Sequence, residues 1–335
     1  MLHIALNGLG RIGKNIVRLL FTREDIKNHI SLVALNSGPA SLEQVVHSLR
    51  YDSLLGSFPG SITVSGSILS INNHPVQVYT QLDPEKIPWK NNQIDWVIEA
   101  SGKFKTQEQA YKHITAGAGH VLITAPSADA PIIIIPGVNM AAYTDQKIVS
   151  LGSCTTNALA PLLYSIDQAC GIKSAFFTTI HAYTNDQVLL DVEHQDMRRS
   201  RAAAFNIIPT TTGARNVIGK VIPHLAGFID GCSVRVPVAK VSLLDLVCQV
   251  TTPMGSSILN KKFKEAAEHH LKGIMAYETN PLVSSDFSGN AHSVIVDSLL
   301  THVVGDMLKV YGWYDNEWGY SNRLIDFLVH QALRS

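Results

Sequence analysis

The sequence predicts an α/β protein with a parallel sheet in its first half and an α+β region with a large mixed sheet in its second half. Strand-like and helix-like stretches alternate up to about residue 150, and a glycine-rich turn follows the first strand. This alternation favours a parallel sheet with helices on both faces. Longer alternating runs beyond residue 150 favour a mixed or antiparallel sheet. With 335 residues, 46% of them hydrophobic, the chain is long enough for two domains of roughly 100–200 residues each.

The first half opens with a buried strand predicted at 1–6 and an amphipathic helix predicted at 11–21. The helix is predicted because Ile12, Ile16, Val17 and Leu20 recur at helical spacing. Further buried strands are predicted at 31–36, 94–99, 120–124 and 132–135. In the second half we predict helices at 159–170 and 258–271, strands at 176–181, 231–237, 242–251 and 309–314, and a final amphipathic helix at 321–333.

Composition excludes several classes of function. The 27 basic residues balance the 27 acidic ones, which argues against nucleic acid or an anionic membrane as the primary partner. No apolar run approaches the ~20 residues that a membrane helix needs, and the chain opens on a strand rather than on a signal peptide. The four cysteines, at 154, 170, 232 and 248, lack the spacing of a disulfide framework or a metal site. We therefore expect a cytoplasmic protein without a bound metal.

Gly8, Gly10 and Gly13 have the spacing of a dinucleotide-binding fingerprint between the first strand and the first helix. Glycines there permit a tight turn, a close approach of the backbone to a pyrophosphate, and close packing of the helix on the strand. The sequence therefore predicts a Rossmann-type domain; the alternative is a tight turn without a ligand. The second strand ends at Asn36 and Ser37, without the acidic residue that usually binds the adenosine ribose.

Cys154 lies among small hydroxyl residues at the start of a helix-like stretch, and His181 follows 27 residues later. A helix N-terminus favours a thiolate, so we expect a lowered pKa for this thiol and a nucleophile–base pair with His181. The hydroxyls of Ser153, Thr155 and Thr156 can bind an anion beside the thiol. A nucleophilic thiol together with a hydride acceptor suggests the oxidation of an aldehyde through a thioester. The alternative is a small buried cysteine and a structural histidine.

Over essentially its whole length the sequence resembles the phosphorylating glyceraldehyde-3-phosphate dehydrogenases. The resemblance is carried by residues 7–13, 51–53, 127–131, 153–157, 181–187, 198–203, 211–213, 235–237 and 313–320. The block around Cys154 and the block from Trp313 to Tyr320 are the most specific of these. The resemblance implies the reversible oxidation of D-glyceraldehyde 3-phosphate to 1,3-bisphosphoglycerate, in glycolysis or gluconeogenesis, by a homotetramer. The implied cofactor is NAD, with NADP as the alternative.

The resemblance also implies roles for individual residues. Cys154 matches the nucleophile, and His181 matches the base. The C3 phosphate of the substrate would meet Thr184 and Arg235, and inorganic phosphate would meet Ser153, Thr155, Thr212 and Gly213. Cofactor contacts are expected from Asn7, Gly8, Gly10, Arg11, Ile12, Asn36, Ser37, Ser101, Thr124, Asn316 and Tyr320. The expected domains are a dinucleotide-binding domain at 1–150, onto which a helix at about 316–335 packs back, and a catalytic domain at 151–315.

Departures from the family leave two questions open. Ser37 replaces the usual acidic ribose ligand, Leu82 stands where an arginine is common near the adenine, and Glu193 follows Val192 in a loop that differs between NAD-type and NADP-type members. NADP is therefore not excluded. Erythrose-4-phosphate dehydrogenase activity and a catalytically silent interaction protein on the same fold remain as alternatives. The family blocks retained here disfavour the first, and the intact Cys154 and His181 disfavour the second. Arg198, Arg199 and Arg201 are interpreted as a subunit-interface cluster.

Overall fold

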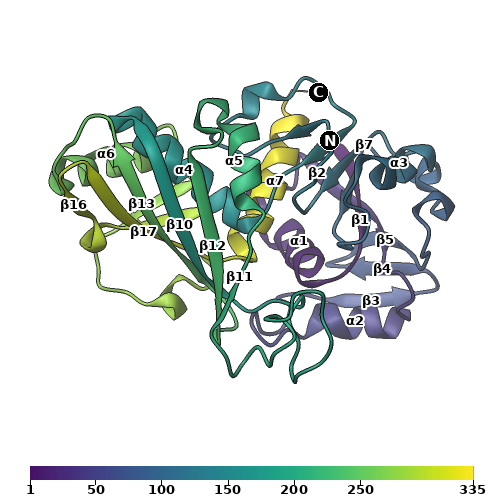
Figure 1. Cartoon of the computed structure of the whole chain (residues 1–335). Helices are drawn as coiled ribbons and strands as arrows, with labels where there is room; N and C mark the ends of the chain where they lie inside the picture. The colour runs from purple at the N-terminus through teal and green to yellow at the C-terminus, as the bar shows by residue number, and fades with distance from the viewer. Residues whose placement is uncertain (335) are drawn as a thin grey trace. The chain divides into compact units, whose positions relative to one another are not determined.

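The computed structural model describes residues 1–334, and the chain divides into two compact units, each built on its own sheet (Figure 1). Unit 1 comprises Met1–Ile134, Ala141–Gly152 and the C-terminal segment that begins at Ser321. Unit 2 comprises Ile135–Met140 and Ser153–Tyr320. No helix among the described residues is long and apolar enough to cross a bilayer.

Unit 1 contains a nine-stranded sheet in the order β3-β4-β5-β2-β1-β6-β7-β9-β8. Its centre is β1 (Leu2–Asn7), which pairs in parallel with β2 (Ile30–Asn36) and β6 (Trp96–Glu99). These strands are almost wholly apolar and buried, as expected when helices cover both faces. The remaining strands are β3 (Ile62–Ser65), β4 (Ile68–Ile71), β5 (His74–Tyr79), β7 (His120–Ile123), β8 (Ile132–Ile133) and β9 (Ile148–Ser150).

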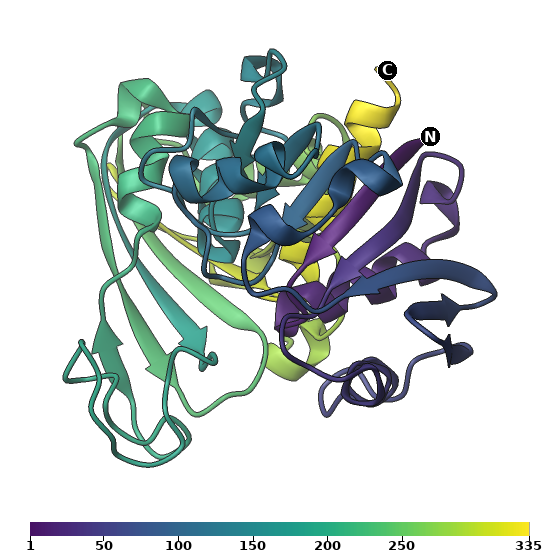
Figure 2. The same cartoon turned by 90° about the vertical axis from the view of Figure 1, so that its right-hand side faces the viewer.

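The helices of unit 1 are α1 (Arg11–Thr22), α2 (Leu42–Arg50), α3 (Gln107–Thr115) and the greater part of α7 (Trp318–Ala332). Phe327 of α7 packs edge-on against both Trp96 and Tyr143. The termini of the chain are marked in Figure 2, where the purple strand β1 and the yellow helix α7 are both visible. The carboxyl ends of β1, β2 and β6 lie side by side at one edge of the sheet, because the three strands are parallel neighbours.

Two edge strands depart from the predicted parallel sheet. β3 pairs antiparallel with β4, and β4 pairs antiparallel with β5, so the sheet is mixed at that edge. The short strands that form this edge, between residues 62 and 79, were not predicted from the sequence. Helices α2 and α3 were also missed, although each begins with a capping box that the sequence displays: Ser41 with Gln44, and Thr106 with Gln109.

Unit 2 contains the large mixed sheet that the sequence predicts. Its order is β11-β12-β10-β13-β17-β15-β14, with β16 paired to β17. β10–β12 and β14–β15 are parallel pairs, and the other pairs are antiparallel. The strands are β10 (Ile172–Ala182), β11 (Ile208–Thr210), β12 (Ile229–Val236), β13 (Ser242–Val250), β14 (Met275–Glu278), β15 (Val294–Asp297), β16 (His302–Val304) and β17 (Met307–Tyr314).

Helix α4 (Cys154–Cys170) packs on this sheet against β10, β13, β15 and β17, while α6 (Ser256–Glu268) packs on β14 and α5 (Ala214–Val221) packs on α4. The sequence placed the start of α4 at residue 159, five residues too late. The run of hydroxyl residues after Cys154 has low helix propensity and concealed the true start. The earlier start makes Cys154 the first residue of α4.

Candidate active site

Helix α4 holds Cys154 at its N-terminus. Ser153 is the N-cap, and its side chain accepts a hydrogen bond from the Thr156 backbone N at 3.1 Å. Gly152 before it has φ of +63°, a conformation that favours glycine and turns the chain from β9 into the helix. Cys154 is partly exposed and forms no disulfide. The fold therefore presents one accessible thiol at a capped helix start.

Strand pairing brings His181 and Arg235 together. The two residues are register partners on the parallel strands β10 and β12, so their side chains lie on the same face of the sheet. His181 Nε2 lies 3.6 Å from Cys154 Sγ. Arg235 Nη1 lies 3.3 Å from the Thr184 hydroxyl and 3.2 Å from the carbonyl oxygen of Ala182. Four of the predicted site residues thus form one cluster.

The hydrogen bonds of His181 fix its tautomer. Its Nδ1 lies 2.6 Å from the carbonyl oxygen of Ala182, which can only accept, so Nδ1 carries the proton. Nε2 is then an acceptor and faces the Cys154 thiol. Arg235 Nη1, 3.2 Å from Nδ1, is a close positive charge rather than a donor to that nitrogen. This arrangement suits transfer of the thiol proton to Nε2.

Burial sets the direction of both pKa values. It raises the pKa of the Cys154 thiol, while the positive charge of Arg235 acts in the opposite direction. Burial and the Arg235 charge together lower the pKa of His181 to about 3. The sequence-based expectation of a lowered thiol pKa is therefore wrong for this chain, because desolvation outweighs the nearby cation. At neutral pH His181 is an uncharged base beside a protonated thiol.

Arg235 and Arg199 form a cationic site. Burial and the charge of Arg199 both lower the pKa of Arg235, and the buried Nε of Arg235 has no hydrogen-bond partner. Arg199 donates to the Thr210 hydroxyl at 3.0 Å and to the Thr211 carbonyl oxygen at 3.2 Å. Arg199 is also paired with Asp186 and Asp196, so Arg235, with its unpartnered Nε, is the guanidinium best placed to bind an anion such as a phosphate. Arg199 had been interpreted only as an interface residue.

The predicted phosphate residues divide between two helix starts. Ser153 and Thr155 belong to the start of α4, whereas Gly213 is the N-cap of α5 and the Thr212 hydroxyl accepts from the Ala214 backbone N at 3.3 Å. Arg199 donates hydrogen bonds to Thr210 and Thr211, which precede the start of α5. The charge of Arg199 also lowers the pKa values of Arg235 and His181. Arg199 therefore links the start of α5 electrostatically to the cluster around Cys154.

Two hydroxyl residues that the sequence did not single out complete the cluster. Tyr314 Oη lies 3.0 Å from Thr155 Oγ1 and 2.7 Å from Thr179 Oγ1, and its ring packs edge-on to His181. Ser242 Oγ accepts from the Ala182 backbone N and donates to Asn316 Oδ1 at 3.3 Å. Tyr314 adjoins Asn316 in a family block, which was the available signal. Ser242 carried no signal in the sequence.

In unit 1 the glycine-rich turn behaves as its spacing predicts. A side chain at Gly8 would lie 2.5 Å from the Ser101 backbone N, and one at Gly13 would lie 2.2 Å from the Gly8 carbonyl oxygen. A side chain at Gly10, by contrast, would meet nothing within 4 Å. Helix α1 has no side-chain cap and no acidic residue in its first turn. This N-terminus without a side-chain cap fits the pyrophosphate of a dinucleotide.

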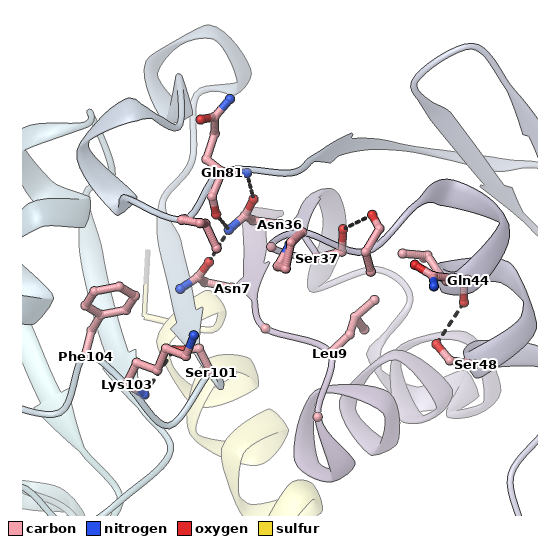
Figure 3. A pocket seen from close by; sticks show the side chains of 17 residues that line it. Asn7, Leu9, Asn36, Ser37, Gln44, Ser48, Gln81, Ser101, Lys103 and Phe104 are labelled. Carbon is pink, nitrogen blue, oxygen red and sulfur yellow. Dashed lines mark hydrogen bonds between the residues drawn. The ribbon is translucent and has the colours of Figure 1, made fainter.

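A cavity of about 510 Å³ lies over this turn, at the carboxyl ends of β1, β2 and β6 (Figure 3). It is lined by six of the predicted cofactor residues: Asn7, Gly8, Gly10, Asn36, Ser37 and Ser101. The other predicted residues lie elsewhere. The Arg11 side chain pairs with Asp52, the Thr124 hydroxyl donates to the Glu99 carbonyl oxygen at 3.0 Å, and Ile12 lies in the first turn of α1. Asn316 and Tyr320 are buried in unit 2.

The described residues contain no cluster of three or more His, Cys, Asp or Glu side chains that could hold a metal ion. The active-site cluster itself presents a thiol, a neutral imidazole and two guanidinium groups.

Comparison with known proteins identifies the family. Residues 2–107 match the family model of the NAD-binding domain of glyceraldehyde 3-phosphate dehydrogenase, and residues 153–316 match the model of its C-terminal domain. The chain is 42% identical to glyceraldehyde-3-phosphate dehydrogenase 2 of Bacillus subtilis, over 99% of this chain and 97% of that protein. It is 46% identical to a chloroplastic glyceraldehyde-3-phosphate dehydrogenase of Arabidopsis thaliana, over 97% of this chain and 82% of that protein. It is 43% identical to glyceraldehyde-3-phosphate dehydrogenase 2 of Streptomyces avermitilis, over 98% of each chain. The chain therefore belongs to the glyceraldehyde-3-phosphate dehydrogenase family of NAD-binding oxidoreductases.

Proposed function

We propose that this chain catalyses the reversible phosphorylating oxidation of D-glyceraldehyde 3-phosphate to 1,3-bisphosphoglycerate. The observation that carries the proposal is the 3.6 Å approach of Cys154 Sγ to the neutral Nε2 of His181. A thiol, a base within reach of its proton and an adjoining anion site together suit acyl transfer from a phosphorylated aldehyde. The reaction would serve glycolysis in one direction and gluconeogenesis in the other.

The first step is attack of Cys154 Sγ on the aldehyde carbon while the thiol proton passes to His181 Nε2. His181 then gives this proton to the aldehyde oxygen, which becomes the hydroxyl of a hemithioacetal, held by His181 and by the Cys154 backbone N–H. His181, neutral again, takes back the hydroxyl proton as the carbonyl re-forms and a hydride leaves the carbon. NAD, when bound, would supply the acceptor of that hydride.

The second step returns the enzyme to its thiol form. Inorganic phosphate, held by Ser153, Thr155, Thr212 and Gly213, attacks the carbonyl carbon of the thioester. The C–S bond breaks, the acyl phosphate leaves and Cys154 is released as a thiolate that His181 protonates. Arg235 and Thr184 hold the C3 phosphate of the substrate throughout, which orients its carbonyl carbon toward Sγ.

The residues proposed to bind the cofactor fall into two groups. Asn7, Gly8, Gly10, Asn36, Ser37 and Ser101 would bind the adenosine half, with the pyrophosphate at the N-terminus of α1 near Arg11 and Ile12. Asn316 would hold the carboxamide of the nicotinamide, because Ser242 donates to its Oδ1 and leaves its Nδ2 free to donate. Tyr320 and Thr124 would contribute packing and positioning.

We further propose a cytoplasmic homotetramer with no primary role on nucleic acid or membranes. The support for assembly is a set of large apolar side chains on the segment after β10. Leu189, Met197 and Phe205 each expose 86–87% of their surface, which is more apolar exposure than a monomer needs. A second copy of the chain would cover them.

Assays of the purified chain test the proposed activity. With NAD and inorganic phosphate, D-glyceraldehyde 3-phosphate should give a higher kcat/KM than erythrose 4-phosphate, and the product should be an acyl phosphate. A preference for erythrose 4-phosphate would favour the related dehydrogenase. Absence of turnover with either aldehyde, despite NAD binding, would favour a catalytically silent interaction protein.

A further inference from the structure

A carboxylate buried in unit 1 lies behind the cofactor cavity, and the proposed chemistry does not use it. Glu99, the last residue of β6, is 2% exposed. Its Oε2 accepts from Asn7 Nδ2 at 2.5 Å and from His113 Nε2 at 3.0 Å. Its Oε1 accepts from the Ser101 backbone N at 2.8 Å and from the Ser101 hydroxyl. Four donors occupy the four lone-pair positions of one carboxylate, so Glu99 acts only as an acceptor.

The tautomer of His113, one of these four donors, is fixed by a hydrogen bond from Trp89. His113 is fully buried, and its Nδ1 lies 3.0 Å from the indole Nε1 of Trp89, also fully buried. An indole N–H only donates, so Nδ1 must be the acceptor and Nε2 must carry the single ring proton. Trp89 therefore fixes His113 as the neutral tautomer that donates to Glu99. A buried carboxylate loses stability if any of its hydrogen-bond donors turns away, so each donor must keep its orientation.

Hydrogen bonds to Glu99 fix the orientation of the side chains that line the cavity. Because Asn7 Nδ2 donates to Glu99, Asn7 Oδ1 faces Asn36 and accepts from its Nδ2 at 2.7 Å. Asn36 Nδ2 also donates to the Gln81 carbonyl oxygen at 2.9 Å, and Asn36 Oδ1 accepts from the Gln81 backbone N at 2.8 Å. Figure 3 shows Asn7, Asn36 and Gln81 joined in this way beside Ser37 and Ser101. Rotating the side-chain amide of Asn7 or Asn36 by half a turn would place one N–H group against another and break these hydrogen bonds.

These hydrogen bonds connect the loops that form the cavity. Asn7 ends β1, Asn36 ends β2 and Ser101 follows β6, and all three line the cavity together with Gln81. Gly8 already lies so close to Ser101 that no side chain fits between them. One carboxylate therefore sets the mutual spacing of the three strand ends on which a dinucleotide would lie. Preorganised contacts of this kind lower the cost of binding.

We propose that Glu99, His113 and Trp89 are positioning residues for the adenosine half of the cofactor, acting through Asn7, Asn36 and Ser101. This inference rests on the proposed function for the identity of the ligand. It assigns to the buried trio an effect on cofactor affinity that is separate from the chemistry of the thiol. It also attributes that effect to hydrogen-bond polarity rather than to packing.

The variants His113→Gln and His113→Leu form a matched pair that tests polarity against packing. Glutamine can accept from Trp89 through Oε1 and donate to Glu99 through Nε2, whereas leucine fills space and does neither. Calorimetry on the purified full-length chain should give a Kd for NAD within about twofold of wild type for His113→Gln and roughly tenfold higher for His113→Leu. Glu99→Gln, which turns an amide donor toward existing donors, should raise the Kd at least as much.

Two further measurements separate positioning from general damage. The KM for NAD should rise with the Kd while kcat changes little, and iodoacetamide should alkylate Cys154 at the wild-type rate. Glu108→Gln, which removes an exposed carboxylate from the same helix α3, should leave the Kd unchanged. Equal loss of affinity for NAD in His113→Gln and His113→Leu, or a wild-type Kd in both, would overturn the inference. If Glu99→Gln does not fold, the comparison of the two His113 variants is sufficient to test it. A wild-type chain that does not bind NAD at all would overturn the proposed function instead.

Discussion

The proposed chemistry depends on the transfer of one proton from the Cys154 thiol to His181. The His181 Nδ1 proton is committed to the Ala182 carbonyl oxygen, so Nε2 is the only ring atom that can receive the thiol proton. Burial and Arg235 keep the imidazole neutral by lowering its pKa to about 3. The base is therefore available at any pH at which the folded chain would be assayed.

His181→Asn removes this base while keeping a polar side chain. We expect kcat to fall roughly 10²–10⁴-fold and alkylation of the thiol by iodoacetamide to slow near neutral pH. Pre-steady-state kinetics and the pH dependence of alkylation measure the two effects. An unchanged alkylation profile would rule out His181 as the base that takes the thiol proton when Cys154 reacts.

The same substitution has a consequence for stability. His181 has a lowered pKa in the folded chain and an ordinary value near 6.5 when unfolded, so the unfolded state binds the extra proton first. The contribution of His181 to the free energy of unfolding is fully present above about pH 6.5 and is lost as the pH falls from there toward about 3. Urea unfolding of His181→Asn should accordingly show a shallower loss of stability over that window than wild type.

Arg235 has a buried Nε without a partner and a second guanidinium nearby, which are the properties of an anion site. Arg235→Leu should raise KM far more for D-glyceraldehyde 3-phosphate than for unphosphorylated glyceraldehyde, because only the former loses a charge-assisted bond. Arg215→Leu is the matched control, since Arg215 is exposed and pairs with Asp230. Equal losses on both aldehydes would contradict the assignment.

At the scale of elements, hydrophobic periodicity predicted the buried strands well. β1, β2, β6 and β7 lie within two residues of their predicted bounds, because each is an apolar run with few polar neighbours. The start of α4 was misplaced because Thr155, Thr156 and Asn157 have low helix propensity, and the Ser153 cap overrides it. The edge strands β3 and β4 were missed because each is only four residues long and half exposed.

The site was predicted unevenly for related reasons. Cys154, His181 and Arg235 lie in distinctive sequence blocks, and the register of β10 with β12 brings the latter two together. The raised pKa of the thiol and the hydrogen-bonded role of Glu99 depend on burial and on partners far apart in sequence, such as Asn7 and His113. No local pattern carries that information.

We expect the carboxyl end of β2 to set the preference between NAD and NADP. Ser37 lines the cavity, and its hydroxyl makes only long contacts, at 3.4 Å, with backbone carbonyl oxygens. A neutral residue there does not repel a 2′-phosphate, so we expect activity with NAD and measurable activity with NADP. Ser37→Asp should increase the ratio of kcat/KM for NAD to that for NADP by about tenfold or more, which corresponds to ~1.4 kcal/mol.

Ser48→Asp is the control for Ser37→Asp, because it adds the same charge to another wall of the same cavity. An equal shift in that variant would indicate net charge rather than position 37. A wild-type preference for NADP above ~100-fold would show that another cation in the cavity binds the 2′-phosphate.

At the scale of the whole molecule, the fold class is the prediction that the comparisons confirm most directly, since both family models match. The boundary between the domains and the assembly remain predictions. Sedimentation of the purified chain should give a tetramer, and charging the exposed segment with Leu190→Glu and Met197→Glu should produce smaller species. Tyr111→Glu, an exposed position on α3, should leave the tetramer intact. A wild-type monomer would contradict the assembly.

The central claim is that Cys154 carries the acyl group between oxidation and phosphorolysis. Intact-mass and peptide mass spectrometry of the wild-type chain with D-glyceraldehyde 3-phosphate and NAD, without inorganic phosphate, measures it most directly. We expect a phosphoglyceryl adduct on the peptide that contains Cys154, its disappearance when phosphate is added, and no adduct or oxidation in Cys154→Ser, although that variant still binds NAD. Dehydrogenase activity in Cys154→Ser, or an adduct on Cys170, Cys232 or Cys248 in place of Cys154, would contradict the account.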